Sequence, residues 1–136
     1  TEGAEIHRRH RNRIVMEDSK ADITGKIIEA AIDVQKELGQ YLLEVTYQRA
    51  LLVELNARGM EYSREVEIPI KYKGKQIDKR RVDFIIEDIL VEIKAKEDIE
   101  DRDKIQLLSY LRNSGHKLGL LLNFGKLPLQ IKRIAN

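Results

Sequence analysis

Three side chains in one apolar stretch of the sequence have residue types that could do chemistry together. Asp83, Glu92 and Lys94 lie within residues 81–95, the most apolar part of a chain in which 35% of the residues are charged. Two partly buried carboxylates repel each other and need a counter-charge, which a hard cation such as Mg²⁺ or Mn²⁺ supplies. An amine beside them can stabilise a phosphate or help deprotonate a metal-bound water. The three residues therefore predict metal-assisted hydrolysis of phosphodiesters.

The spacing brings these side chains together if the stretch folds as a hairpin. With Glu87 and Asp88 as a two-residue loop, Asp83 lies directly opposite Glu92. Lys94 is two residues beyond Glu92 and shares its strand face whatever the length of the loop. The apolar residues of the hairpin are expected to pack on the opposite face: Val82, Phe84, Ile86, Val91 and Ile93.

A purely structural explanation is also open from these residues. An Asp and a Glu on a hairpin, followed by a Lys, can simply pair with neighbouring basic residues such as Arg80, Arg81 or Lys96. Under that explanation, neutralising both carboxylates should cost stability rather than add it.

Hydrophobic periodicity predicts the elements that must position these residues. Apolar residues at steps of three and four predict helices over 22–38, 42–58 and 102–113. Alternating residues predict a strand over 66–72, where Pro69 indicates an edge strand or a bulge. The two hairpin strands follow, then the third helix, an apolar strand over 118–124 and a short amphipathic tail. This order predicts a mixed α/β domain with helices packed on a sheet.

Length and composition limit the function classes. A chain of 136 residues with 42% hydrophobic residues predicts one folded domain, over 19–136, after a basic tail or expression remnant over 1–18. The sequence contains no cysteine, so a bound metal would sit on oxygen ligands or on one of three histidines. No apolar run is long enough to span a bilayer, and no signal peptide is recognisable, so a cytoplasmic protein is expected.

The wider pattern resembles a known family. Asp83 followed by Glu92-Ile93-Lys94 resembles the PD-(D/E)xK nuclease signature, and residues 24–134 resemble its GxxExxY branch. The matching segments are Leu38-Gly39, Leu42-Leu43-Glu44 with Tyr47, Ala50-Leu51 with Glu54-Leu55, Ile68-Pro69-Ile70 with Tyr72-Lys73-Gly74, Arg81-Val82-Asp83, Val91 to Ala95, Gln106 to Leu111 and Gly119 to Gly125. The resemblance implies a restriction-endonuclease-like mixed β-sheet core flanked by helices.

The resemblance also implies roles for residues outside the hairpin. It implies that Glu44, on the inward stripe of the second helix, joins Asp83 and Glu92 as a metal ligand. A simpler explanation is that an acid in the first turn suits the helix dipole. Gln106 and Tyr110 resemble a QxxxY motif that borders the active site, although four-residue spacing also describes a solvated helix face.

One position departs from the family pattern. Tyr41 stands where a glycine is expected three residues before Glu44, so the turn into the second helix is expected to differ.

These observations predict a nuclease that uses Mg²⁺ or Mn²⁺ and acts on nucleic acid, on DNA more than on RNA. Candidate contacts to the phosphate backbone are Lys79, Arg80, Lys96, Lys104, Lys132 and Arg133. The alternative is a module of the same fold that binds nucleic acid or protein without turnover, because fold alone does not decide function. A homodimer or a protein partner is compatible with either.

Overall fold

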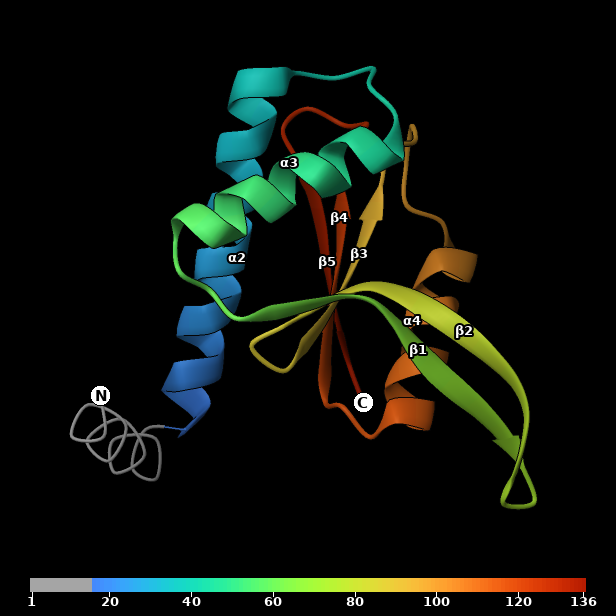
Figure 1. The fold of residues 1–136 in the computed structure, drawn as a ribbon. Helices are drawn as coiled ribbons and strands as arrows, with labels where there is room; N and C mark the ends of the chain where they lie inside the picture. The colour runs from blue at the N-terminus through green and yellow to red at the C-terminus, as the bar shows by residue number, and fades with distance from the viewer. Residues whose placement is uncertain (1–15) are drawn as a thin grey trace.

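The computed structural model describes residues 16–136, with side chains from Lys20 onward. This part of the chain forms a five-stranded sheet with helices on both faces (Figure 1). The elements are α2 (Met16–Leu38), α3 (Glu44–Ala57), β1 (Tyr62–Tyr72), β2 (Lys75–Ile86), β3 (Ile89–Lys94), α4 (Asp101–Ser114), β4 (Leu118–Asn123) and β5 (Gln130–Ala135).

The sheet is mixed, as the sequence predicted. Its strands stand in the order β1-β2-β3-β4-β5, and neighbouring strands are antiparallel except for the parallel pair of β3 and β4. Parallel neighbours need a crossover connection, which α4 provides between β3 and β4. The predicted α/β restriction-endonuclease-like fold class is confirmed.

Two apolar clusters hold the layers together. On one face, α2 and α3 pack against the sheet through residues such as Ile27, Leu51 and Phe84, each with no exposed surface. On the other face, Leu107 and Leu111 of α4 pack on a smaller cluster. Figure 1 shows α2 and α3 on one side of the strands and α4 on the other. The hairpin of β2 and β3 therefore lies between two helical layers.

Val82 does not pack on the face that alternation predicted. It lies in the α4 cluster, whereas Phe84, two residues later, lies in the cluster of α2 and α3. Backbone pairing of β1 with β2 is interrupted between these two residues, where Glu65 has a φ of 50° opposite Asp83. This irregularity turns the strand and moves Val82 to the other face. The prediction for Val82 was wrong, and the irregularity lies at Asp83 itself.

The ends of the chain differ from the predicted pattern. Helix α2 begins at Met16, six residues before the predicted start, so residues 16–18 are not part of a tail. Their sequence is polar and has no apolar stripe to indicate a helix, although most of it is compatible with one. Residues 1–15 lie outside the described residues. The expected amphipathic tail is the edge strand β5, which pairs antiparallel with β4.

Candidate metal-binding active site

The turn between β2 and β3 confirms the predicted two-residue loop. Ile86 pairs with Ile89 and Phe84 pairs with Val91. Glu87 and Asp88 have φ values of 47° and 79°, the pair of positive values that a tight type I′ hairpin turn requires. The register that brings the two carboxylates together is therefore present, even though Glu-Asp is a weak turn sequence.

Beyond Phe84 and Val91, side chains replace the backbone hydrogen bonds between the two strands. The backbone N–H of Asp83 donates to Oε1 of Glu92 over 2.9 Å. The backbone N–H of Ile93 donates to Oδ2 of Asp83 over 2.8 Å. Each carboxylate thus bonds the backbone of the other strand, and the strands separate at this point. Asp83 and Glu92 lie together, as predicted, but they are linked through backbone amides rather than as a regular cross-strand pair.

Both carboxylates hold their protons more tightly than usual. Burial, with the charge of Glu44 contributing, raises the pKa of Asp83 to about 6 against the hydrogen bond from Ile93. Burial and the charge of Asp83 raise the pKa of Glu92 to about 8. Glu92 is only 7% exposed, so water screens this repulsion poorly. A cation at this position would relieve both effects.

Lys94 extends from the same face of β3 as Glu92 and lies near a buried acid that sequence reasoning missed. Its amine is 3.9 Å from Oδ1 of Asp103, which is 6% exposed. The other oxygen of Asp103 accepts hydrogen bonds from the Lys96 amine, at 2.9 Å, and from the backbone of Glu100, at 2.8 Å. Although burial alone would raise the pKa of Asp103, these partners hold it below its ordinary value.

The signal for Asp103 was present but had another explanation. Asp103 is the third residue of α4, and its side chain completes a capping box with Glu100. An acid in the first turn of a helix is expected for that reason alone. Its contacts with Lys94, the last residue of β3, and with Lys96, just beyond it, could not be read from the sequence.

Asn123, which the sequence left without a role, fixes the chain immediately after Lys94. Its side chain accepts a hydrogen bond from the backbone N–H of Lys96 at 3.0 Å and donates to the carbonyl of the same residue at 2.9 Å. It also accepts from the backbone of Gly125 at 3.1 Å. Asn123 has no exposed surface. The segment that carries Lys94 and Lys96 is therefore held at the end of β4.

Glu44 is the first residue of α3, which begins two residues later than predicted. Its side chain is exposed, so the prediction that it lies on the inward stripe with Tyr47 was wrong. Its charge contributes to the raised pKa values of Asp83 and Glu92, so it acts on the carboxylate pair through space. Over residues 16–136, however, no three acidic or histidine side chains stand close enough to hold a metal together. The structure brings Asp83 and Glu92 together and leaves Glu44 outside that pair.

The turn before Glu44 is held by Tyr47, the other family residue on this helix. The Tyr47 hydroxyl donates to the carbonyl of Gly39 at 2.6 Å and accepts from the backbone of Leu42 at 3.3 Å. Within this turn Tyr41 has a φ of 74°, a left-handed conformation that favours glycine. The departure from the family glycine therefore leaves the turn in the conformation that glycine would adopt.

The two residues of the QxxxY pattern have different environments. Tyr110 is 5% exposed in the α4 cluster, and burial followed by the charge of Glu92 raises its pKa. Tyr110 therefore borders the carboxylate pair. Gln106 is exposed on α4, one turn earlier, and no hydrogen bond of its side chain occurs among residues 16–136.

The basic residues predicted to contact phosphates are dispersed. Arg80 lies in β2 near Tyr110, whose pKa it lowers in part, whereas Lys79 pairs with Glu67 at 3.3 Å. Lys96 forms an ion pair with Asp103 at 2.9 Å, and Lys104 forms one with Asp101 at 3.7 Å. The remaining two candidates, Lys132 and Arg133, are exposed on the far edge strand β5, two strands from β3.

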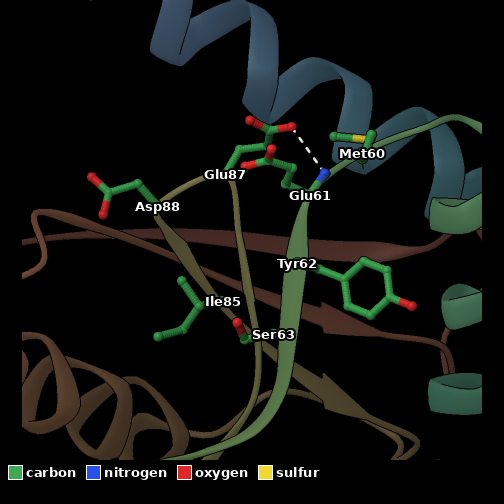
Figure 2. Close-up of a pocket in the computed structure, with 7 residues that line it drawn as sticks. All are labelled: Met60, Glu61, Tyr62, Ser63, Ile85, Glu87 and Asp88. Carbon is green, nitrogen blue, oxygen red and sulfur yellow. Dashed lines mark hydrogen bonds between the residues drawn. The ribbon is translucent and has the colours of Figure 1, made fainter.

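An open pocket lies at the other end of the hairpin. It has a volume of about 480 Å³ and is lined by Met60, Glu61, Tyr62, Ser63, Ile85, Glu87 and Asp88 (Figure 2). The Glu87 side chain accepts a hydrogen bond from the backbone of Glu61 at 3.1 Å, as the dashed line in Figure 2 shows. Neither the carboxylate pair nor Lys94 lines this pocket, so its chemistry is separate from theirs.

Over residues 16–136, none of the helices combines the length and the apolar character needed to cross a membrane.

Comparisons with known proteins agree with this geometry. The chain is similar to the protein in a solved structure titled "Crystal structure of SSO0001", with a TM-score of 0.53 and 27% sequence identity. The match covers 65% of this chain and 48% of that chain, so this chain spans about half the length of that protein. A search of curated proteins gave no match. The family model of the PD-(D/E)XK nuclease superfamily matches residues 21–134, which include both carboxylates, Lys94, strands β1 to β4 and all but the last residue of β5. The chain belongs to the PD-(D/E)XK nuclease superfamily.

Proposed function

We propose that this protein is a nuclease that hydrolyses phosphodiester bonds, of DNA more than of RNA, with Mg²⁺ or Mn²⁺ held by Asp83 and Glu92. The observation that carries the proposal is the buried carboxylate pair, whose pKa values are raised to about 6 and about 8 by burial and mutual repulsion, which the charge of Lys94 offsets only in part. Superfamily membership supports the reaction class, since such nucleases use divalent metal ions.

The residues fit a hard divalent cation. Backbone amides occupy Oε1 of Glu92 and Oδ2 of Asp83. Among the described residues, the second oxygen of each carboxylate accepts no hydrogen bond from the protein and so remains available as a ligand. Mg²⁺ is typically held by one or two carboxylates, with water and substrate phosphates completing its shell. Two carboxylates are therefore sufficient, and the cation would lower the barrier by activating water and neutralising phosphate charge.

Lys94 would act on the substrate from beside this pair. Its position on the same strand face as Glu92 directs the amine toward the space in front of the carboxylates. There the amine would position the attacking water and stabilise the charge that develops on the scissile phosphate. An ion pair with Asp103, at 3.9 Å, limits the orientations of this amine.

The finer assignment within the superfamily is the GxxExxY branch. Glu44 and Tyr47 stand at the required spacing, and Tyr47 bonds the turn that presents Glu44. We infer that Glu44 contributes to the metal site directly or through a bound water, with Gln106 and Tyr110 bordering the substrate on the α4 side. The carbonyl of Ile93 is a further candidate ligand.

The test is a cleavage assay with Mn²⁺ on linear, circular, single-stranded and branched nucleic acids. Lys94→Ala should reduce the cleavage rate at least about 100-fold, because a positioned charge at the reacting phosphate is lost. Lys117→Ala is the matched control, because Lys117 is an exposed lysine outside the site, and its rate should equal that of the parent. Equal cleavage by Lys94→Ala and the parent would contradict the proposal and would indicate a contaminating nuclease.

A further inference from the structure

The outer part of the β1–β2 hairpin, residues 69–81, forms a ribbon that extends beyond the sheet. β2 pairs with β3 only through Phe84, Ile85 and Ile86, so among the described strands the outer part of β2 pairs with β1 alone. Every residue over 71–81 is exposed. Figure 1 shows this hairpin curving away from the body past α4. Over residues 71–81 the ribbon therefore offers an exposed two-stranded surface.

The ribbon is strongly basic although the chain is not. Residues 71–81 carry six basic side chains and one acid, a net charge of +5, whereas the whole chain carries only +2. The basic residues are Lys71, Lys73, Lys75, Lys79, Arg80 and Arg81. The last three have exposed acidic neighbours at 3.3 to 3.8 Å. Within residues 16–136 the first three, at the tip, form no ion pair, so the tip presents uncompensated positive charge.

Apolar side chains stand among these lysines at the tip. Tyr72 is 62% exposed and Ile77 is 66% exposed. The Lys73 amine lies over the Tyr72 ring, 5.5 Å from its centre. Cationic side chains can contact the phosphates that border a groove of nucleic acid, and apolar side chains between them can contact base edges and methyl groups inside the groove.

The ribbon also begins at the candidate site. Asp83 is the next but one residue after Arg81 in β2, and about eight residues separate it from the tip. At about 3.3 Å per residue the ribbon reaches at most about 26 Å from Asp83. That is less than the rise of about 34 Å in one turn of B-form DNA. A duplex held along the ribbon would therefore be cut within one helical turn of where the tip contacts it.

We propose that the ribbon of residues 69–81 lies in the major groove of B-form duplex DNA and holds the substrate for the site at Asp83 and Glu92. The major groove of B-form DNA, about 12 Å wide, admits a two-stranded β-ribbon, whereas the major groove of A-form RNA is too narrow and deep. The proposal rests on the proposed nuclease function and specifies its substrate class. The three lysines at the tip contact phosphates on both sides of the groove, with Tyr72 and Ile77 toward the bases.

The test is binding of the full chain to a labelled 24-base-pair DNA duplex, measured by fluorescence anisotropy with EDTA present to prevent cleavage. The ribbon variant is Lys71→Gln with Lys73→Gln and Lys75→Gln. The matched control is Lys20→Gln with Lys36→Gln and Lys117→Gln, which removes the same charge from exposed positions elsewhere. Each protein is also titrated with duplex RNA and single-stranded DNA of the same sequence, over a series of salt concentrations.

The ribbon variant should bind the DNA duplex at least 10-fold more weakly than the parent. The slope of log K against log salt concentration should decrease in magnitude by about 2 to 3, because three phosphate contacts are lost. The control should change affinity less than about 2-fold, and the parent should prefer duplex DNA to both other ligands. Equal losses in the two variants, or equal affinity for duplex RNA, would overturn the proposal.

Cleavage separates this proposal from the nuclease proposal. With Mn²⁺, the ribbon variant should raise KM for duplex DNA and leave kcat within about 2-fold of the parent, because it does not touch the carboxylates. A loss of kcat with unchanged KM would contradict the ribbon as a binding element. If the parent does not cleave at all, the nuclease proposal fails, and the anisotropy result still decides whether the ribbon binds duplex DNA.

Discussion

At the scale of single residues, the proposed chemistry depends on two carboxylates that the fold brings together although their charges repel each other. Asp83 and Glu92 each bond a backbone amide of the opposite strand, and burial raises both pKa values. A pair used only for structure would be expected to have a basic partner. The charge of Lys94 lowers both pKa values in part, but its ion pair is with Asp103, at 3.9 Å. The metal-free pair is therefore a source of instability, which can be measured.

Neutralising the pair should stabilise the metal-free protein. Glu92→Gln keeps an oxygen to accept from the backbone of Asp83 and removes the repulsion, so the free energy of unfolding at pH 8 should rise by on the order of 1–2 kcal/mol. Urea unfolding in EDTA measures this change. The control is Glu97→Gln, an exposed position, which should change little. A loss of stability in Glu92→Gln would favour the purely structural explanation.

The same pair should make the metal-free protein less stable as pH rises. A carboxyl with a raised pKa binds more protons in the folded state than in the unfolded state. Its stabilising effect is therefore full below the unfolded pKa and is lost as pH rises through the folded pKa. For Asp83 and Glu92 that loss runs from about pH 4 through about 6 and about 8.

Urea titrations in EDTA from pH 5 to pH 9 should show the free energy of unfolding falling by several kcal/mol. Saturating Mn²⁺ should reduce this fall, because the bound cation favours the ionised carboxylates. In Glu92→Gln the part of the fall above about pH 6 should disappear. A flat profile in the parent protein would mean that the pair ionises normally.

At the scale of elements, the sequence predicted the hairpin better than it predicted what surrounds it. The register followed from Glu87 and Asp88 as the two polar residues between two apolar runs of equal length, residues 84–86 and 89–91, which pair residue for residue. The face of Val82 was mispredicted because the irregularity opposite Asp83 is a backbone property with no side-chain signature. The roles of Asp103 and Asn123 were not predicted, because they depend on contacts between elements that are distant in the sequence.

The connection after Lys94 should tolerate no added side chain at Gly125. A Cβ there would overlap the backbone nitrogen and oxygen of Lys96, neither of which can move without breaking the bonds to Asn123. Gly125→Ala should lower the free energy of unfolding by about 3 kcal/mol or more. Gly25→Ala is the control, because a Cβ at that exposed helical position meets nothing within 4 Å. The control should gain about 1 kcal/mol.

These two alanine variants are compared by thermal and urea unfolding. Equal stability in Gly125→Ala and the parent would show that the close approach to Lys96 is not required for the fold.

Glycine at position 41, which the family pattern expects, should relieve backbone strain in the turn before α3. Tyr41 is 92% exposed and has a φ of 74°, so its side chain adds strain without packing. Tyr41→Gly should raise the free energy of unfolding by about 0.5 kcal/mol, after allowance for the greater freedom of glycine in the unfolded chain. Tyr41→Ala keeps the strain and should show no gain. Lower stability of Tyr41→Gly than of Tyr41→Ala would contradict the strain at this position, because the added freedom of glycine in the unfolded chain would then outweigh any relief.

At the scale of the whole molecule, the two helical layers cover different apolar clusters of the sheet. α2 and α3 cover the larger apolar cluster, and α4 covers the smaller one beside the carboxylate pair. Charge is distributed just as unevenly, with an excess of +5 over residues 71–81 in a chain of net charge +2. Composition alone gave no reason to expect nucleic acid, because the overall balance hides this concentration. The three-dimensional fold joins the basic ribbon directly to Asp83.

The central claim is that Asp83 and Glu92 hold a divalent cation, and isothermal titration with Mn²⁺ at pH 8 tests it most directly. The parent protein is compared with the double variant Asp83→Asn with Glu92→Gln, whose retained fold is checked by urea unfolding. We predict saturable binding by the parent and an affinity at least about 100-fold lower in the double variant, because both charged ligands are gone. Equal Mn²⁺ affinity in the two proteins would contradict the account.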